Sequence, residues 1–331
     1  MSKTPFHIAD LSKLSFLITG GAGFIGSNLV QYLVKHNAGK IRVLDNLATG
    51  NVKNISGINK TQFEFIEGDI RDPDTCRKSC EGIDYVSHQA ALGSVPRSVK
   101  DPQSTHAVNS TGFLNMIVAA RDAGVKRFVY ASSSSVYGDH PGLPKKEDET
   151  GNPLSPYAVS KKSNELYARV FAETYNMEVI GLRYFNVFGP NQSPDGPYAA
   201  VIPLFMQGVL ENKSPSIDGD GEQSRDFTFV ENAVQANILA LLTTNKEALN
   251  KIYNVAVGER VTVNELFNVV AGLVKSELKP FYRASRPGDV RDSLADISAA
   301  KKFLGYNPTV RIEEGLKLTL EWFRQSLVKS Y

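Results

Sequence analysis

Cysteine is nearly absent from this sequence of 331 residues, which contains only Cys76 and Cys80. The two lie four residues apart in a segment that predicts a helix, so a disulfide framework is not expected. No apolar run approaches the roughly 20 residues that cross a bilayer. The N-terminus also lacks the basic, apolar and small-residue regions of a signal peptide. These absences predict a reduced, soluble, cytoplasmic protein.

An excess of either charge is absent as well, because 37 lysines and arginines stand against 35 aspartates and glutamates, for a net charge of +2. So balanced a chain has no field suited to nucleic acid or to an anionic membrane, and neither is expected as a partner. The five histidines show no metal-ligand spacing, and His88 lies in an apolar run that predicts a packed side chain. The run from Asp218 to Glu222 is similar to the start of a calcium loop, but the twelfth position is Phe229, where a bidentate glutamate is required. No metal site is expected.

Apolar residues make up 42% of the chain and charged residues 22%, which excludes disorder and supplies a core. The first half alternates short β-rich runs with amphipathic stretches. This alternation predicts an α/β fold in which helices cover both faces of a parallel sheet. The predicted strands are residues 16–19, 41–45, 63–67, 85–88, 128–131 and 179–183, and predicted helices include residues 25–35, 111–122 and 156–175.

After Tyr184 the pattern changes, because loops rich in glycine, proline and aspartate alternate with isolated helices. A helical stretch at 230–242 and a strand-like run at 253–257 are apolar enough to return to the main sheet. We therefore predict a first domain over residues 1–189, with a return of the chain to it at 228–258. A smaller C-terminal α/β lobe would comprise mainly residues 190–331.

Glycine recurs where the first predicted strand runs into the first helix. Gly20, Gly23 and Gly26 have the spacing G-x-x-G-x-x-G, a variant of the dinucleotide fingerprint. The missing Cβ atoms allow a tight turn and let a pyrophosphate approach the backbone, and the helix N-terminus offers it free N–H groups. The alternative is an ordinary glycine-rich turn. The flanking strand and helix favour a Rossmann-type, doubly wound parallel sheet that binds a dinucleotide.

Asp45 ends the second predicted strand, 19 residues beyond Gly26. A carboxylate at this place accepts hydrogen bonds from both ribose hydroxyls and would repel a 2′-phosphate, which favours NAD over NADP. The alternative is a capping or turn aspartate. Asp69 ends the third predicted strand, and we expect it to contact the adenine.

Tyr157 and Lys161 lie one turn apart on a helix that has Ser155 as its predicted N-cap and Pro156 in its first position. A phenol, with a pKa of about 10, is a poor base at neutral pH. A neighbouring ammonium and a positively charged nicotinamide would both lower that pKa. The four serines at 132–135 follow another strand and could place a hydroxyl beside the same substrate oxygen. Each motif is common on protein surfaces, but together they indicate a catalytic site.

Over essentially the whole chain, these motifs resemble the extended short-chain dehydrogenase/reductase family and, within it, the UDP-hexose 4-epimerases. The stretches at 90–98 and 137–144 resemble, in particular, the bacterial UDP-N-acetylglucosamine 4-epimerases of surface-polysaccharide synthesis. The segments that carry the resemblance are 20–26, 45–46, 68–69, 89–91, 133–138, 157–161, 183–189, 219–227 and 286–289.

The resemblance implies a mechanism. Tyr157 would remove the proton from the sugar 4-hydroxyl while C4 passes a hydride to tightly held NAD. The 4-keto sugar would then turn over in the site and take the hydride back on its other face. Ser133 would hydrogen-bond O4, and Lys161 would bind the nicotinamide ribose and lower the pKa of Tyr157. Family dehydratases carry Asp-Glu at the positions of Ser134 and Ser135, so loss of water is not expected.

The resemblance also implies the binding residues. Asn186, Arg225 and Arg286 are the choices for the diphosphate, since arginine makes charged, fork-shaped contacts to phosphate oxygens, although each arginine could instead form a solvated ion pair. The residues expected to hold NAD are Gly20, Gly23, Phe24, Ile25, Gly26, Asp45, Asn46, Gly50, Asp69, Ile70, Gln89, Ala90, Tyr157, Lys161 and Val187. The residues expected to bind the UDP-sugar are Ser94, Ser133, Ser134, Ser135, Tyr157, Asn186, Val201, Arg225, Arg286, Asp289 and Ser293.

Ser293 bears on which sugar is accepted. In the related enzymes restricted to UDP-glucose and UDP-galactose, the position four after the aspartate corresponding to Asp289 carries a tyrosine. A serine there would leave room for an N-acetyl group, which implies interconversion of UDP-N-acetylglucosamine and UDP-N-acetylgalactosamine. Two alternatives stay open. One is a UDP-hexuronate epimerase or decarboxylase, with Arg97 as the added cation, and the other is a non-catalytic sensor of NAD or nucleotide sugars.

Members of the family usually pair through the helix that carries the tyrosine and lysine and through the helix before it, forming a four-helix bundle. In this chain these are the predicted helices at 156–175 and at roughly 103–122. The resemblance therefore implies a homodimer.

Overall fold

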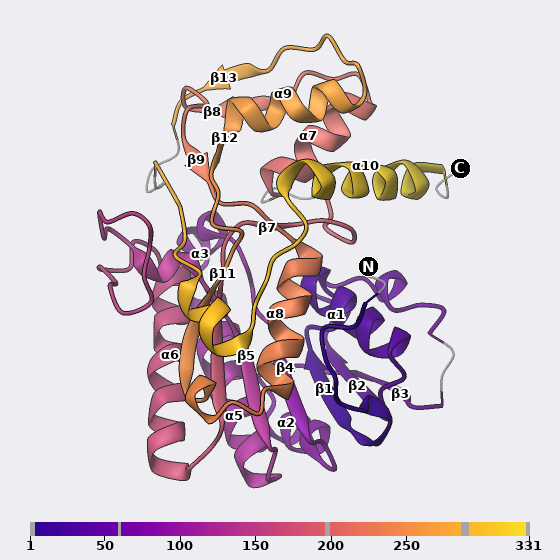
Figure 1. Cartoon of the computed structure of the whole chain (residues 1–331), viewed down its shortest axis with the longest axis vertical. Helices are drawn as coiled ribbons and strands as arrows, with labels where there is room; N and C mark the ends of the chain where they lie inside the picture. The colour runs from indigo at the N-terminus through magenta and orange to yellow at the C-terminus, as the bar shows by residue number, and fades with distance from the viewer. Residues whose placement is uncertain (1–3, 59–60, 196–198, 286–290, 329–331) are drawn as a thin grey trace.

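The computed structural model describes residues 4–58, 61–195, 199–285 and 291–328 (Figure 1). Its centre is a parallel sheet in which the strand order is β11-β6-β5-β4-β1-β2-β3. The chain enters the sheet in the middle and builds outward first on one side and then on the other, so the sheet is doubly wound. The predicted Rossmann-type α/β fold is confirmed. The strands are β1 (Ser15–Thr19), β2 (Lys40–Asp45), β3 (Phe63–Glu67), β4 (Tyr85–His88), β5 (Arg127–Ser133), β6 (Val179–Tyr184) and β11 (Lys251–Val255).

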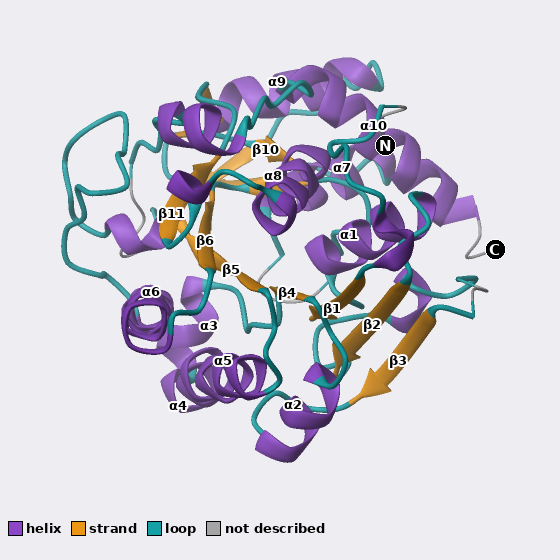
Figure 2. Cartoon of the chain, turned by 60° about the horizontal axis from the view of Figure 1, so that its bottom comes forward, coloured by secondary structure: helices purple, strands orange, loops and turns teal. Residues whose placement is uncertain are grey.

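Both faces of the sheet are buried, and Figure 2 shows a layer of helices on each. Successive side chains of β1 point to opposite faces: Phe16 and Ile18 belong to one core cluster and Leu17 to the other. Cys76 and Cys80 are buried free thiols in the second cluster. One face carries α1 (Phe24–Lys35) and α8 (Val230–Leu242), and the other carries α2 (Pro73–Cys80), α3 (Val95–Lys100), α4 (Pro102–His106), α5 (Gly112–Asp122) and α6 (Pro156–Tyr175).

The helix expected at about 103–122 is present, with helical backbone throughout, but it widens by a π-helical segment in its middle. A π-turn, η3 (Ala107–Thr111), joins α4 to α5. Within it Asn109 donates from Nδ2 to the carbonyl oxygen of Leu92 (3.0 Å) and accepts from the Leu92 N–H (2.7 Å). The wider turn thus presents an amide to the backbone of a distant loop, a contact that periodicity does not reveal.

A second group of elements lies above the sheet in Figure 1 and shares its own core, which includes Phe205, Phe229 and Leu266. The chain enters this group after β6 and leaves it twice: through α8 and β11, which complete the sheet, and again at 295–306, where Ala300 and Leu304 pack into the core of the main sheet. The division of the chain into two domains remains a prediction. The elements of this group are β7 (Val187–Phe188), α7 (Val201–Leu210), β8 (Ser216–Asp218), β9 (Ser224–Arg225), β10 (Thr228–Phe229), β12 (Val261–Thr262), α9 (Val263–Leu273), β13 (Phe281–Arg283) and α10 (Ile312–Val328).

The strand predicted at 253–257 begins and ends two residues earlier, as β11, because its register is set by β6, where Val255 pairs with Tyr184. Short helical turns connect the remaining elements. Among the described helices, none is both long and apolar enough to cross a membrane. The turns are η1 (Leu11–Lys13), η2 (Val52–Asn54), η4 (Ser134–Tyr137), η5 (Lys246–Ala248) and η6 (Ala300–Leu304).

Candidate active site

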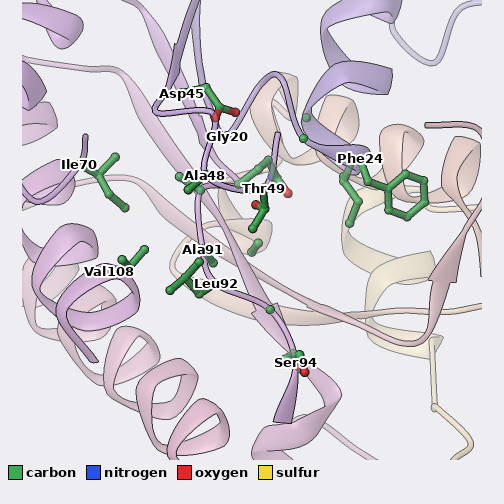
Figure 3. Close-up of a pocket in the computed structure, with 18 of the residues that line it drawn as sticks. Gly20, Phe24, Asp45, Ala48, Thr49, Ile70, Ala91, Leu92, Ser94 and Val108 are labelled. Atoms are coloured by element: carbon green, nitrogen blue, oxygen red, sulfur yellow. The ribbon is translucent and has the colours of Figure 1, made fainter. Parts of the chain in front are cut away.

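A cleft of about 670 Å³ runs along the carboxyl ends of β1, β2, β4, β5 and β6. This is the edge at which doubly wound sheets bind ligands, beside the point where the strand order reverses. Figure 3 shows Asp45 and Gly20 toward one end of the cleft and Ser94 toward the other. The sequence-predicted residues that line it are Gly20, Gly23, Phe24, Ile25, Gly26, Asp45, Asn46, Ile70, Gln89, Ala90, Ser94, Ser133, Ser134, Tyr157, Lys161, Asn186 and Val187.

The glycine turn is closely packed backbone. Gly20 has a φ of +67°, and a Cβ added to it would lie 2.7 Å from the Ala90 nitrogen. A Cβ on Gly26 would lie 2.2 Å from the carbonyl oxygen of Gly20. Helix α1 then begins at Phe24 without a side-chain cap or an acidic residue in its first turn, so its N–H groups suit an anion. The turn fits the pyrophosphate of a dinucleotide.

Asp45 lies at the end of β2 beside this turn and is nearly buried. Its carboxylate accepts hydrogen bonds from the N–H groups of Ala22 and Leu47, both at 2.9 Å. Gly50 borders the carboxylate, since a Cβ there would lie 3.0 Å from both oxygens. Two of the roughly four acceptor sites of a carboxylate are therefore used by the protein, and the rest suit the hydroxyls of a ribose.

Asp69 lies next to the cleft, but its carboxylate is engaged with the protein. Arg71 donates to it through Nη2 at 2.7 Å, and Asn46 donates through Nδ2 at 2.8 Å. Mainly because of the Arg71 hydrogen bond, the pKa of Asp69 falls to about 2. Ile70 and Arg71 line the cleft, whereas Asp69 does not. Arg71 was not among the predicted residues, although it directly follows Gly68-Asp69-Ile70 in the sequence.

Sequence reasoning also missed the polar network that Tyr184 and Asn237 form with the predicted residue Gln89; Tyr184 and Gln89 both line the cleft. Tyr184, which follows Arg183 in β6, donates from its hydroxyl to Gln89 Oε1 at 3.0 Å and accepts from Asn237 Nδ2 at 2.7 Å. Gln89 in turn donates to Asn237 Oδ1 at 3.0 Å. The amide of Gln89 is thus held by protein groups on both ends. Asn237 lies inside the apolar helix α8, where the sequence pattern predicts only packing.

Ser94 marks the far end of the cleft (Figure 3). It is the N-cap of α3, and its hydroxyl accepts a 3.3 Å hydrogen bond from the Arg97 N–H. Its φ is +93°, a conformation that a residue with a side chain rarely adopts. Strained residues of this kind cluster at ligand sites.

Tyr157 and Lys161 enter the cleft from the first turns of α6. Ser155 caps that helix, accepting from the Ala158 N–H at 3.1 Å, and Pro156 occupies its first position, as predicted. The Nζ of Lys161 lies 5.9 Å from the centre of the Tyr157 ring and donates a 2.8 Å hydrogen bond to the carbonyl oxygen of Ala131. The first two turns of α6 therefore place the phenol of Tyr157 and the amine of Lys161 beside the end of β5.

The pKa of the Tyr157 phenol is raised, because burial outweighs the lowering by a hydrogen bond with Ser133. The sequence-based expectation that Lys161 lowers this pKa is therefore not met: the pKa of Tyr157 lies above its ordinary value, not below it. Burial also lowers the pKa of Lys161 to about 8, against the opposing field of Glu165. A positive charge beside the phenol would lower its pKa, which is what an oxidised nicotinamide would supply there.

The residues expected at the sugar nucleotide are only partly gathered at the cleft. Asn186 lines it and donates to the carbonyl oxygen of Asp226 at 3.2 Å. Arg225 lies in β9 and donates to the carbonyl oxygens of Ser224 (2.9 Å) and Arg291 (3.0 Å). Arg286 and Asp289 lie outside the described residues. Val201 begins α7, and Ser293 lies beside β9; these two and Arg225 are not part of the cleft lining.

The remaining serine and histidine predictions concern buried groups. Ser135 does not line the cleft; its N–H donates to Ser133 Oγ at 3.1 Å, and its own Oγ is buried without a hydrogen-bond partner among the described residues. His88 is packed as predicted, with Nδ1 2.9 Å from Thr19 Oγ1, and burial lowers its pKa to about 3. Within the described part of the chain, no three His, Cys, Asp or Glu side chains gather as a metal site would need.

Comparison with known proteins identifies relatives of this chain. The model of the NAD dependent epimerase/dehydratase family matches residues 16–256. A putative UDP-glucose 4-epimerase of Methanocaldococcus jannaschii is 38% identical over 94% of this chain and 98% of its own length. A UDP-glucuronate 4-epimerase of Thermodesulfobacterium geofontis is 34% identical over 95% of this chain and 98% of its own length.

A solved structure of a UDP-sugar 4-epimerase has a similar fold. The UDP-N-acetylglucosamine 4-epimerase of Methanobrevibacter ruminantium, in complex with UDP-N-acetylmuramic acid, matches with a TM-score of 0.90 and 40% identity, over 95% of this chain and 99% of that one. The glycine turn, Asp45 and the tyrosine and lysine of α6 fit the cofactor that this family uses. The chain belongs to the NAD dependent epimerase/dehydratase family, alongside UDP-sugar 4-epimerases, and NAD is its cofactor.

Proposed function

We propose that this protein interconverts UDP-N-acetylglucosamine and UDP-N-acetylgalactosamine by epimerisation at C4, and that the product feeds surface-polysaccharide synthesis. The observation that carries the proposal is the meeting of Ser133, Tyr157 and Lys161 in one cleft with the glycine turn. A sensor that only binds nucleotide would need the turn but not a phenol and an amine directed at the same space.

The chain's own residues divide the work of the reaction. Ser133 holds the sugar O4 by a hydrogen bond, and Tyr157 takes the proton of the 4-hydroxyl and returns it to O4 once the sugar has turned over and C4 is reduced on its other face. NAD bound at the glycine turn would supply the acceptor and donor for the hydride of C4. Lys161 provides the positive charge that favours the phenolate of Tyr157 and donates to the ribose beside it. The transient 4-keto sugar must turn within the cleft, so the nucleotide is held more firmly than the sugar.

Ser134 and Ser135 stand where family dehydratases carry an acid and a base. A hydroxyl does not exchange protons readily at neutral pH, so elimination of water from the sugar has no catalyst at these positions. Ser134 lines the cleft and Ser135 directs its N–H to Ser133. Both residues therefore support epimerisation over dehydration.

The preference for acetylated sugars rests on Ser293, whose side chain is short enough to leave space for an N-acetyl group. The similarity to the UDP-N-acetylglucosamine 4-epimerase of M. ruminantium supports this preference. Arg225, Arg286 and Asp289 are proposed for the diphosphate and uridine end, and Asn186 joins them from the cleft.

A homodimer is part of the proposal, because α6 carries an exposed apolar stripe along its outer side. Val159, Leu166, Tyr167 and Val170 are 54%, 57%, 39% and 50% exposed. Their spacing of seven, one and three residues keeps them on one side of the helix. Pairing of two such stripes in a four-helix bundle with the helices before α6 would bury this surface.

A panel of UDP-sugars tests the substrate directly. The purified protein, with no nicotinamide added, is incubated with UDP-glucose, UDP-N-acetylglucosamine and UDP-glucuronate, and the products are separated by chromatography. The proposal expects the highest kcat/KM on the acetylated pair. Turnover of UDP-glucuronate alone would point to Arg97 as the partner of a sugar carboxylate and favour a hexuronate epimerase. Absence of turnover on every sugar would favour a sensor.

A further inference from the structure

Tyr157, Lys161 and Glu165 follow one another along α6 at intervals of four residues, about one helical turn each. On an exposed helix, a lysine and a glutamate at this spacing commonly form an ion pair. Here the carboxylate is bound from the sheet instead. Arg183 of β6 donates from Nε to Glu165 Oε1 at 2.8 Å and from Nη2 to Oε2 at 3.0 Å.

This ion pair is buried, and both of its members make further hydrogen bonds. The side chains of Arg183 and Glu165 are 2% and 3% exposed. Ser132, the neighbour of Ser133 in β5, donates from Oγ to Glu165 Oε1 at 2.6 Å. The third nitrogen of Arg183 donates to the carbonyl oxygen of Glu147 at 2.8 Å. Lys161 meanwhile donates to the carbonyl oxygen of Ala131. The two-point contact of the guanidinium thus holds the carboxylate in place.

The other groups that face this cluster are mostly uncharged at neutral pH. Burial lowers the pKa of His88, which faces Lys161 from β4, to about 3. Burial raises the pKa of Tyr130 well above 10 and that of Tyr137, whose ring centre lies 4.8 Å from the Arg183 guanidinium, to about 12. Lys162, 31% exposed, lies 3.8 Å from Glu165 Oε2.

Among the described residues, Glu147 is a further carboxylate that interacts with Arg183. Its Oε1 accepts from the Asn254 N–H at 2.8 Å, and burial raises the pKa of this carboxyl. Among the described residues, the carboxylate one turn from Lys161 is that of Glu165. The group that neutralises Glu165 therefore determines how strongly the positive charge of Lys161 acts on the pKa of Tyr157.

We propose that Arg183 and Glu165 are positioning residues for the proton transfer. By binding the carboxylate of Glu165, Arg183 keeps it from neutralising the ammonium of Lys161, so that the positive charge of Lys161 acts on Tyr157. The pair thereby sets the pH above which Tyr157 accepts the sugar proton. This inference rests on the proposed catalytic roles of Tyr157 and Lys161.

The test is the pH at which Tyr157 ionises, followed in two ways. One is the acid limb of the kcat/KM profile. The other is phenolate absorbance without substrate, taken as the difference between each variant and the same variant carrying Tyr157→Phe. In Arg183→Met, an uncompensated Glu165 would neutralise Lys161, and both readouts should move upward by about one pH unit or more. If Arg183→Met does not fold, Arg183→Gln, which can still donate to Glu165 but carries no charge, should show the same direction.

The double variant Arg183→Met/Glu165→Met removes both charges, so no uncompensated carboxylate acts on Lys161 and both readouts should return to the wild-type position. We expect it to fold, because replacing a buried ion pair by apolar side chains is often neutral for stability. The matched control is Arg127→Met, which removes the arginine of the Arg127–Glu178 pair (2.6 Å) at the opposite end of β5. An unshifted Arg183 variant, a double variant as shifted as the single one, or an equally shifted Arg127→Met overturns the inference. Activity retained in Tyr157→Phe would instead overturn the proposed function.

Discussion

The backbone N–H of Ser293 donates a 3.1 Å hydrogen bond to the carbonyl oxygen of Ser224, the residue that precedes Arg225 in β9. Backbone groups make this contact, so the side chain at 293 can change without breaking it. The segment that carries the proposed specificity residue is thereby joined to the strand that carries a proposed diphosphate ligand.

We expect Ser293→Tyr to lower kcat/KM on the acetylated UDP-sugars selectively. Overfilling a pocket costs about 1–3 kcal/mol, so the loss should be about tenfold or more. Initial rates on the acetylated and non-acetylated pairs measure it, with Ser293→Ala as the matched control. Equal losses on both pairs would show that this position does not set specificity.

Gly26→Ala should abolish retention of NAD. Its Cβ would lie 2.2 Å from the carbonyl oxygen of Gly20, and the turn would have to open where the pyrophosphate binds. The wild-type protein is expected to retain NAD through purification, and the nicotinamide in the supernatant after denaturation measures it. Gly272→Ala is the control, because the corresponding Cβ in α9 meets no atom within 4 Å. Equal nicotinamide contents in the two variants would contradict a role of the glycine turn in binding NAD.

Tyr157→Phe and Lys161→Met should each lower epimerisation by about 10²–10⁴-fold while the protein remains folded, which is the usual loss of a general acid–base group. Ser133→Ala should lose less, since neighbouring hydroxyls or water can replace its hydrogen bond. Turnover on the preferred UDP-sugar, with circular dichroism as the folding control, provides the comparison. Near-wild-type rates in Tyr157→Phe would remove the proposed base.

The pKa of about 8 at Lys161 predicts a basic limb in the kcat/KM profile. Below this pH the ammonium is present and favours the phenolate of Tyr157; above it the charge is lost and activity should fall. Rates between pH 6 and 10 in Lys161→Met, which has no charge to lose, are the comparison. The basic limb should be missing from that variant, and its persistence would assign it to another group.

His88 should make the protein less stable in acid. Its pKa is about 3 in the folded chain and 6.5 when unfolded, so the unfolded state binds more protons between these values. Stability is therefore lost as the pH falls, by about 2 kcal/mol between pH 7 and pH 5. Urea unfolding of His88→Asn should show a smaller loss, whereas His106→Asn, at an exposed position, should match the wild type.

Leu166→Asp should convert the proposed dimer into monomers, because it places a charge in the middle of the apolar stripe on α6. Light scattering at micromolar concentration measures the mass. Leu318→Asp is the matched control, since Leu318 is an exposed leucine on α10, 37% accessible, far from the stripe. A wild-type monomer, or a Leu166→Asp dimer, would rule out this interface.

The pattern of neighbouring residues was sufficient to predict the bounds of several helices and strands. The strand predicted at 63–67, the strand at 85–88 and the helix at 156–175 have the predicted bounds in the structure. The reasons lie in neighbouring residues: alternation of apolar side chains, a serine N-cap and a proline in the first turn. The glycine turn was equally readable, because the steric demand is made by residues only a few positions apart.

The sequence by itself thus determined the layered fold, the glycine turn and the one-turn spacing of Tyr157 and Lys161. Tertiary structure alone decided which polar groups meet. Arg183 of β6 reaches Glu165 of helix α6, and Asn237 reaches Gln89 across 148 residues of chain. No periodic pattern in the sequence predicts either contact. Each exists because strand pairing and helix packing bring remote side chains to one end of the sheet, where burial makes an unpaired polar group costly.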